Sequence, residues 1–223
     1  MNEEQGSIRK TRVLGLILLS GLGGLVACSP SPPDSPTPTA SAELETVQES
    51  PQPPSEAELW SRLQNAEQED VTYVVLLRHA IAPGTGDPPN FQLDDCTTQR
   101  NLSDAGRQQA RDIGEAFRSR NIPVKQVFSS QWCRCLDTAE LLNLGTVKPL
   151  PSLNSFFENR SQATEQTQQT QDFLLETEHP SGVLVLVSHQ VNIRALSGIS
   201  PRSGEAVILE LNGELAVLGR LLG

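Results

Sequence analysis

The sequence predicts an α/β fold, a three-layer sandwich in which helices flank a mostly parallel central sheet. Strand-like and helix-like runs alternate through residues 56–223, which is the pattern of a sheet built from parallel strands. Two apolar runs, Val71–Leu77 and Val183–Val187, are each followed closely by a histidine. An open α/β sheet carries its ligand site at the carboxyl ends of such strands, so His79 and His189 are expected in one crevice.

Helical periodicity and capping residues predict the covering layers of this domain. The expected helices are 56–68, 104–120, 131–142, 161–178 and 191–197. Ser103 and Ser130 stand before the second and third of these helices and are expected to cap them. The remaining segments must then supply the sheet.

Apolar runs and turn residues predict the strands. The expected strands are 71–78, 124–129, 146–150, 183–188, 205–211 and 214–221. A loop rich in proline and glycine follows the first strand and continues to Asn101. Asn212-Gly213 lies between the last two strands and predicts a two-residue hairpin turn, because both turn positions need positive φ.

The first 28 residues have the pattern of a bacterial export signal. Arg9, Lys10 and Arg12 precede an apolar stretch that ends in Leu25-Val26-Ala27-Cys28. This ending resembles a lipobox, after which the chain is cleaved before the cysteine and Cys28 is acylated. The alternative is a plain signal peptide with an incidental cysteine. Two or three acyl chains on Cys28 would hold the protein at a membrane.

Residues 29–55 have the composition of a disordered tether. Prolines stand among serines, threonines and glutamates, with few side chains to bury. An extended tether of about 3.1 Å per residue would reach roughly 80 Å from the lipid surface. The expected organisation is a signal peptide over 1–28, a tether over 29–55 and a domain over 56–223. The protein is thus expected to be exported and membrane-anchored, on the periplasmic or extracellular side.

The charge of the chain argues against nucleic-acid binding. The sequence holds 17 basic and 27 acidic residues, a formal net charge of −10. Removal of residues 1–27 takes away three basic and two acidic groups and moves the charge to −11. Such a surface repels a polyanion, so no nucleic-acid partner is expected.

Side chains at three predicted strand ends share a chemistry that suits phosphate. A neutral imidazole can attack phosphorus near neutral pH, and Arg78 places a forked cation directly beside His79. Arg134 lies in the first turn of the helix after strand 124–129, where unpaired amides also favour an anion. With His189, these residues predict a site for a phosphoryl group.

At these residues the chain resembles the histidine phosphatase superfamily, in its phosphoglycerate-mutase-like branch 1. The resemblance covers about 72–211 and rests on Leu77-Arg78-His79-Ala80, Ser129-Ser130 with Arg134 and Thr138-Ala139, Ser188-His189, and Arg100-Asn101-Leu102-Ser103 with Gly106 and Gln109-Ala110. It implies a phosphoglycerate-mutase-like fold and a phosphomonoester hydrolase that acts through a phosphohistidine. The substrate would be a small phosphorylated metabolite or sugar phosphate.

The resemblance also implies roles for single residues. His79 would be the nucleophile, and Arg78, Arg134 and His189 would bind the phosphate oxygens, without a metal or cofactor. Glu158 stands 24 positions after Arg134 and would protonate the leaving group. Phe156-Phe157 before it are expected to desolvate the carboxyl and keep it protonated. The alternative is that Glu158 is a solvated loop acid.

Departures from the family pattern favour a phosphatase over a mutase. Ala80 stands where many members have glycine, and the glutamate or serine and the asparagine that mutases carry shortly afterwards are missing. A non-catalytic lipoprotein that binds phosphoesters, a pseudoenzyme, remains an alternative. A zinc hydrolase is disfavoured, because no third ligand has suitable spacing.

Three cysteines of the domain, Cys96, Cys133 and Cys135, are expected in an oxidising compartment. A disulfide from Cys96 to Cys133 or to Cys135 would fix the loop near Arg134 and leave one thiol free. Metal binding is the rival interpretation, but Cys133 and Cys135 do not share a helix face. The partners expected for the whole chain are therefore a small phosphoester and, through Cys28, a membrane.

Overall fold

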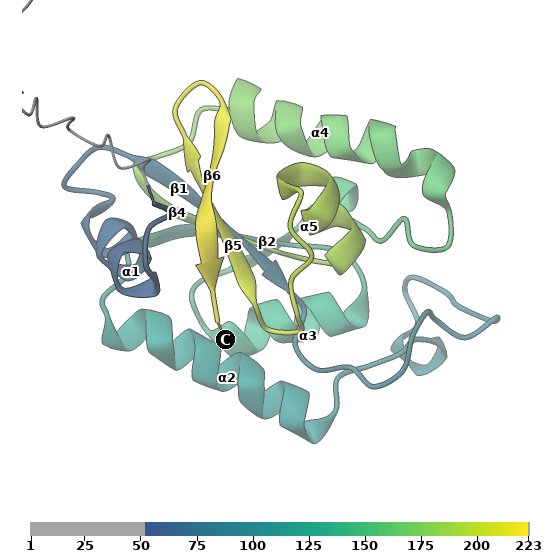
Figure 1. Ribbon diagram of the computed structural model, residues 1–223. Helices are drawn as coiled ribbons and strands as arrows, with labels where there is room; N and C mark the ends of the chain where they lie inside the picture. The colour runs from purple at the N-terminus through teal and green to yellow at the C-terminus, as the bar shows by residue number, and fades with distance from the viewer. Residues whose placement is uncertain (1–51, 223) are drawn as a thin grey trace, which may run out of the picture. The chain divides into compact units, whose positions relative to one another are not determined.

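A computed structural model describes residues 52–222 (Figure 1). The predicted signal peptide, Cys28 and most of the predicted tether lie outside these residues. Ser55, at the end of the predicted tether, is the N-cap of the first helix. Within residues 52–222, no helix has the length and apolar character needed to cross a membrane.

The sheet contains six strands within the described residues, in the order β3-β2-β4-β1-β5-β6. The strands are β1 (Thr72–Arg78), β2 (Val124–Ser129), β3 (Val147–Pro149), β4 (Gly182–Ser188), β5 (Ala206–Leu211) and β6 (Leu215–Leu221). The first four in this spatial order pair in parallel, whereas β5 pairs antiparallel with both of its neighbours, β1 and β6. The prediction of a mostly parallel sheet is confirmed.

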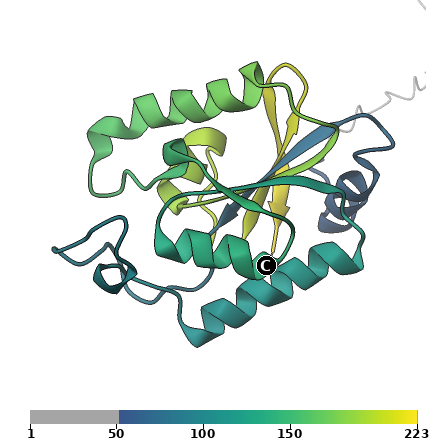
Figure 2. The ribbon, with the colours of Figure 1, turned by 180° about the vertical axis from the view of Figure 1, so that it is seen from behind.

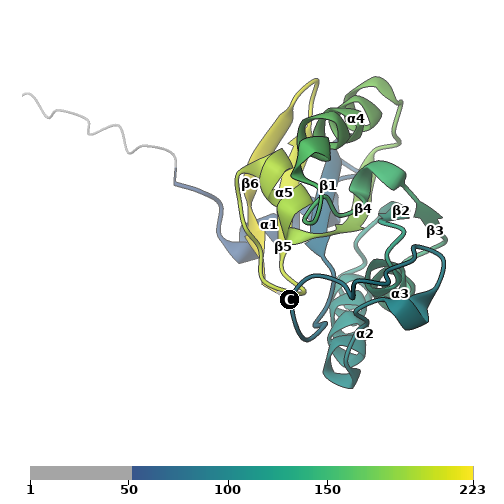
Figure 3. The same cartoon turned by 90° about the vertical axis from the view of Figure 1, so that its right-hand side faces the viewer.

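Helices cover both faces of the sheet, which confirms the three-layer α/β class (Figures 1 and 2). One face carries α1 (Glu56–Asn65), α2 (Asp104–Ser119) and α3 (Cys133–Leu142), and the other carries α4 (Ala163–Glu176) and α5 (Gln190–Ser197). Figure 3 shows α4 and α5 apart from α2 and α3, with strands between them.

Each face of the sheet has its own apolar core, because successive side chains of a strand point to opposite faces. On β1, Val75 and Leu77 pack with Phe117 of α2, whereas Val74 and Leu76 belong to the core under α4 and α5. All five side chains are at most 4% exposed. Burial on both faces explains why the central strands read as continuous apolar runs.

The register of the central strands places the two histidines side by side. Arg78 of β1 pairs with Ser188 of β4, and both histidines come one residue later. The backbone N–H of His79 donates to the carbonyl of Ser188 at 3.0 Å. The two side chains therefore leave the sheet at the same level and at the same edge.

The start of α2 follows the prediction. Ser103 is its N-cap, and the Ser103 hydroxyl accepts a hydrogen bond from the Gly106 N–H at 3.1 Å. Gly106 lies against the loop after β1, where a Cβ atom would stand 2.0 Å from the carbonyl oxygen of Ile81. Only glycine lets the helix begin this close to the loop that carries the site.

The predicted cap of α3 is wrong. The helix begins at Cys133, two residues later than expected, and its N-cap is Trp132, without a side-chain capping bond. The hydroxyl of Ser130 instead lies 2.9 Å from His189 Nε2 and donates to Asn154 Oδ1 at 3.2 Å. The same hydroxyl accepts from the Trp132 backbone N–H at 3.3 Å, so it has one local partner and two that are distant in sequence.

The predicted two-residue hairpin turn is also wrong, although the hairpin itself is present. Leu211 pairs with Leu215, so the loop has three residues, and only Gly213 of Asn212-Gly213 has positive φ (+88°). A register shift on the same hairpin, between Ile208 and Leu209, accompanies the odd-numbered loop.

Candidate active site

A pocket of about 610 Å³ lies at the carboxyl ends of the parallel strands. Its lining includes every catalytic and phosphate-binding residue expected from the sequence: Arg78, His79, Arg134, Glu158 and His189. These residues come from β1, the first turn of α3, the loop before α4 and the start of α5. The topology therefore brings five residues, spread over 112 sequence positions from 78 to 189, into one pocket.

The two imidazoles meet edge to face in this pocket. Their ring centroids lie 5.5 Å apart and their planes are inclined by 66°. His79 directly follows β1, and His189 is the N-cap residue of α5. Both side chains are buried.

His79 is held as a neutral imidazole with one free lone pair. Burial lowers its pKa to about 3, and the charges of Arg134, Arg78 and Arg100 act in the same direction. Its Nδ1 lies 2.8 Å from the carbonyl oxygen of Ala80. A carbonyl oxygen only accepts, so Nδ1 carries the proton and Nε2 carries the lone pair.

His189 is fixed through both of its ring nitrogens. Nδ1 lies 3.4 Å from Nη2 of Arg134, which only donates, so Nδ1 is the acceptor. Nε2 then carries the proton and donates to the hydroxyl of Ser130 at 2.9 Å. Burial, followed by the charge of Arg134, lowers the pKa of His189 well below its usual value. This imidazole is also neutral at pH 7.

Arg134 forms a two-point ion pair with Asp87, a residue that the sequence did not single out for this role. Nη1 and Nη2 of Arg134 lie 2.7 Å and 3.1 Å from the two carboxylate oxygens of Asp87. Their side chains are only 3% and 10% exposed. Asp87 also accepts from the indole N–H of Trp132 and from the backbone N–H of Arg100. Its carboxylate thus has four donors.

Asp87 is ionised in this setting. Burial opposes its ionisation, but the hydrogen bonds and the charge of Arg134 outweigh that effect and lower the pKa of Asp87. No periodicity marks Asp87 in the sequence, because it lies in the loop after β1, between Gly86 and Pro88. The only signal in the sequence was the position of Asp87 in the loop that follows β1 and His79.

Two further arginines contribute positive charge to the pocket. Nη1 of Arg78 donates to the Pro201 carbonyl at 3.0 Å, and Nε of Arg100 donates to the Gly86 carbonyl at 2.8 Å. Within the described residues, the Nε atoms of Arg78 and Arg134 are buried without a hydrogen-bond partner. Such unpaired cationic donors favour an anionic ligand.

Glu158 lines the pocket but its side chain is exposed. Phe156 is buried beneath the loop and Phe157 is 39% exposed, so the two rings do not enclose the carboxyl. The expectation that they desolvate Glu158 is wrong, because neighbours in sequence point to different sides of this loop. Whether Glu158 donates a proton stays a prediction.

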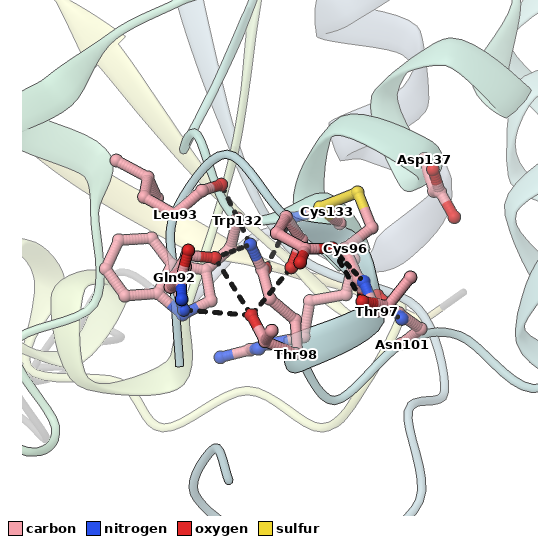
Figure 4. Close-up of a disulfide and its surroundings, with 12 residues drawn as sticks. Gln92, Leu93, Cys96, Thr97, Thr98, Asn101, Trp132, Cys133 and Asp137 are labelled. Atoms are coloured by element: carbon pink, nitrogen blue, oxygen red, sulfur yellow. Dashed lines mark hydrogen bonds between the residues drawn. A yellow bond between two sulfur atoms is a disulfide. The ribbon is translucent and has the colours of Figure 1, made fainter. Parts of the chain in front are cut away.

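The structure joins Cys96 to Cys133 by a disulfide, with Cα atoms 5.7 Å apart (Figure 4). Cys135 is the free, buried thiol, and burial raises its pKa to about 12. The disulfide ties a 3₁₀ turn, Cys96–Thr98, to the first residue of α3. Arg134 is the next residue, so this bond fixes the loop beside the pocket. No group of three or more potential metal ligands occurs within residues 52–222.

Comparison with known proteins agrees with this fold and these motifs. Residues 74–169 match the family model of the histidine phosphatase superfamily, branch 1. No curated protein matches the chain. The matched segment runs from β1 into α4 and includes His79, Arg134 and Glu158.

Several solved structures share the fold at low sequence identity. The Rv3214 protein of Mycobacterium tuberculosis is 20% identical, with a TM-score of 0.52, over 66% of this chain and 97% of that one. A putative phosphohistidine phosphatase, SixA, of Nakamurella multipartitia is 16% identical, with a TM-score of 0.50, over 68% and 96%. The phosphoserine phosphatase of Entamoeba histolytica, in complex with 3-phosphoglyceric acid, is 14% identical, with a TM-score of 0.50, over 68% and 98%.

Proposed function

We propose that this protein is a histidine phosphatase that hydrolyses a small phosphomonoester, with sugar phosphates among the candidate substrates, through a phosphohistidine intermediate. One observation carries the proposal. A neutral His79, with its lone pair on Nε2, shares a pocket with His189 and three arginines. The family match over residues 74–169 supports the same chemistry.

The pocket is suited to hold a phosphoryl group before any bond changes. Phosphoryl transfer depends mainly on positioning and on cations around the oxygens that gather charge. Arg78 and Arg134 each have a buried Nε–H without a partner among the described residues, and a phosphate oxygen would satisfy it. We assign these two arginines to phosphate binding. His189 would join them through Nδ1 once that nitrogen takes up a proton in the presence of the phosphate, because its Nε2–H is donated to Ser130.

In the first chemical step, Nε2 of His79 attacks phosphorus and the bond from phosphorus to the ester oxygen breaks. The electron pair of that bond leaves with the alkoxide, which takes a proton from Glu158. The new phosphohistidine carries positive charge on its ring, and the Nδ1–H bond to the Ala80 carbonyl stabilises that charge.

In the second step, Glu158 as a carboxylate takes a proton from water, and the water oxygen attacks phosphorus. The bond from phosphorus to Nε2 breaks, inorganic phosphate leaves, and His79 returns to its neutral form. The sum of both steps is ester plus water to alcohol plus phosphate. Neither step needs a metal or cofactor.

Hydrolysis and trapping of the intermediate test this proposal together. The protein is expected to hydrolyse a chromogenic aryl phosphate in the presence of a chelator and to form a phosphohistidine that survives analysis without acid. His79→Ala should remove both signals, whereas His179→Ala should keep them, because His179 does not line the pocket. An active His79→Ala variant would refute the nucleophile. Phosphate binding without turnover would favour the non-catalytic binding protein.

The place of the protein in the cell is proposed from its sequence. The signal-like segment 1–28 and the tether-like segment 29–55 favour an exported lipoprotein acylated at Cys28. The disulfide between Cys96 and Cys133 supports export, since such bonds persist in oxidising compartments. Incorporation of labelled palmitate should be lost in Cys28→Ala and kept in Cys135→Ala; labelling of the Cys28→Ala variant would refute the anchor.

A further inference from the structure

The pocket has room for more than a phosphoryl group. Its volume of about 610 Å³ lies within the range of roughly 300–1,000 Å³ that is typical of sites for small organic molecules. The arginines and histidines account for the phosphate end. The remaining lining residues of the pocket therefore indicate which organic group of a substrate would bind there.

Part of this remaining lining is aromatic, and the rest includes the polar residues Thr85, Ser155, Asn159, Gln162 and Gln190. The sequence has two tryptophans, one tyrosine and six phenylalanines, and three of these nine rings line this one pocket: Phe91, Trp132 and Phe157. Phe91 lies in the loop after β1, Trp132 directly before α3, and Phe157 in the loop before α4, so the fold brings together rings that are distant in sequence.

Trp132 stands directly beside the reactive end of the pocket. Its ring centroid lies 5.4 Å from that of His189, with the planes inclined by 78°. Phe91 stacks on the indole at 5.0 Å and 21°, and the indole N–H donates to Asp87 at 3.0 Å. Trp132 is thus held in one orientation without a ligand, so a substrate ring would meet a preformed surface.

Phe157 supplies a ring from another segment. It is 39% exposed, one of the few large apolar side chains that the fold leaves open to water. Its neighbour Glu158 lines the same pocket, on the side assigned to the leaving group. An organic group that leaves toward Glu158 therefore passes beside the ring of Phe157.

We propose that this pocket selects phosphomonoesters whose leaving group is a flat aromatic ring over those of polyols. The proposal rests on the phosphatase function above and narrows its substrate class. Aromatic rings gain from stacked and edge-to-face contacts with other rings. Hydroxyl groups placed against Phe91 and Trp132 would instead lose water without gaining a hydrogen bond there.

Binding of phosphonates tests the proposal apart from catalysis, because their carbon–phosphorus bond replaces the ester bond that the enzyme would cleave. Calorimetric titration of the full chain would use benzylphosphonate, methylphosphonate and 2,3-dihydroxypropylphosphonate. We expect benzylphosphonate to bind about tenfold more tightly than either of the others. Phe157→Ala should lose most of that ratio. Leu175→Ala, which removes a 44% exposed side chain of α4 outside the pocket, should keep it.

The outcomes separate this inference from the proposed function. Equal binding of the three phosphonates, or an unchanged ratio in Phe157→Ala, would overturn the aromatic preference while the phosphate site stands. Tighter binding of the dihydroxypropyl compound would overturn it in favour of polyol esters. Failure of all three to bind would overturn both the preference and the phosphate site.

Discussion

The Asp87 carboxylate binds the guanidinium group of Arg134, which the proposed reaction needs for phosphate binding. Both terminal nitrogens of Arg134 bind this carboxylate, and they also lie 3.4 Å from the Arg100 carbonyl and from His189 Nδ1. Only Nε of Arg134 is left without a partner among the described residues. A phosphate that engages the fork of Arg134 must therefore compete with Asp87.

Asp87→Asn should tighten the binding of inorganic phosphate by about threefold to tenfold, a gain of roughly 1 kcal/mol. The neutral amide keeps the shape of the side chain but removes the competing charge. Titration calorimetry at fixed ionic strength measures the effect, with Asp94→Asn as the control, because Asp94 is an exposed acid of the same loop. Weaker phosphate binding in Asp87→Asn would show instead that the carboxylate positions Arg134.

Glu158→Gln tests the proton donor. We expect a loss of about 10²–10⁴ in kcat/KM with alkyl phosphates, whose leaving groups need a proton, and a smaller loss with aryl phosphates. Parallel assays of one alkyl and one aryl ester reveal the difference. Losses of the same size on both esters would show that Glu158 is not the proton donor. It would then be a solvated loop acid, which agrees with its exposed position.

The roles of single residues were predictable only where a strand or a motif marked them. His79 and His189 each follow an apolar strand, so sequence alone placed them at one sheet edge. The contacts of Asp87 were not predictable, and the sequence left open whether Glu158 is enclosed or solvated, because both residues lie in irregular loops. Contacts there depend on the folded neighbours, such as Trp132 and Arg134, and not on local periodicity.

At the scale of elements, the disulfide joins the loop after β1 to α3. The sequence separation of 37 residues between Cys96 and Cys133 means that the bond restricts a long segment of the unfolded chain. Chain-entropy arguments place the resulting stabilisation at about 2–4 kcal/mol. The same bond holds the loop that carries Asp87 against the helix that carries Arg134.

Reduction of this disulfide should lower the melting temperature and raise KM, because the loop and Arg134 lose their covalent link. Thermal unfolding and phosphatase assays with and without a thiol reductant measure both effects. The double variant Cys96→Ala/Cys133→Ala should resemble the reduced protein and show no further response to reductant. A reductant effect of undiminished size in that variant would exclude the disulfide as the cause.

Capping and turn chemistry predicted some element boundaries and missed others. Ser103 and Ser130 look alike in sequence, as serines that precede helical runs. Ser103 caps α2, whereas Ser130 contacts His189 and Asn154 as well as the Trp132 N–H. The difference lies in the neighbours, because Ser130 is buried at a sheet edge where unpaired polar groups compete for its hydroxyl.

For the molecule as a whole, the fold class was predictable because it depends on many residues at once. Continuous apolar strands between amphipathic helices require a sheet covered on both faces. The residue-by-residue pairing of the strands was harder to predict from the sequence, because packing in both cores sets the register of β1 against β4. That register, with Arg78 opposite Ser188, is what turns two distant histidines into neighbours.

The same buried histidines should make the stability of the whole domain depend on pH. In the unfolded chain their pKa lies near 6.5, whereas burial lowers the pKa of His79 to about 3 and that of His189 well below its usual value. Below pH 6.5 the two histidines therefore bind protons in the unfolded state but stay unprotonated in the folded state. Stability rises with pH in this range and is lost as the pH falls from 6.5 toward 3.

We expect the free energy of unfolding to fall by about 2 kcal/mol through His79 between pH 7 and pH 5, and His189 to act in the same direction. Denaturant titrations at the two pH values measure the change, and His79→Asn should lose the share that His79 contributes, because asparagine does not titrate. Equal pH dependence in the variant and the parent would mean that His79 takes up a proton in the folded protein. In that case His79 would lose the lone pair on Nε2 as the pH falls from 7 to 5, and phosphatase activity should fall with it.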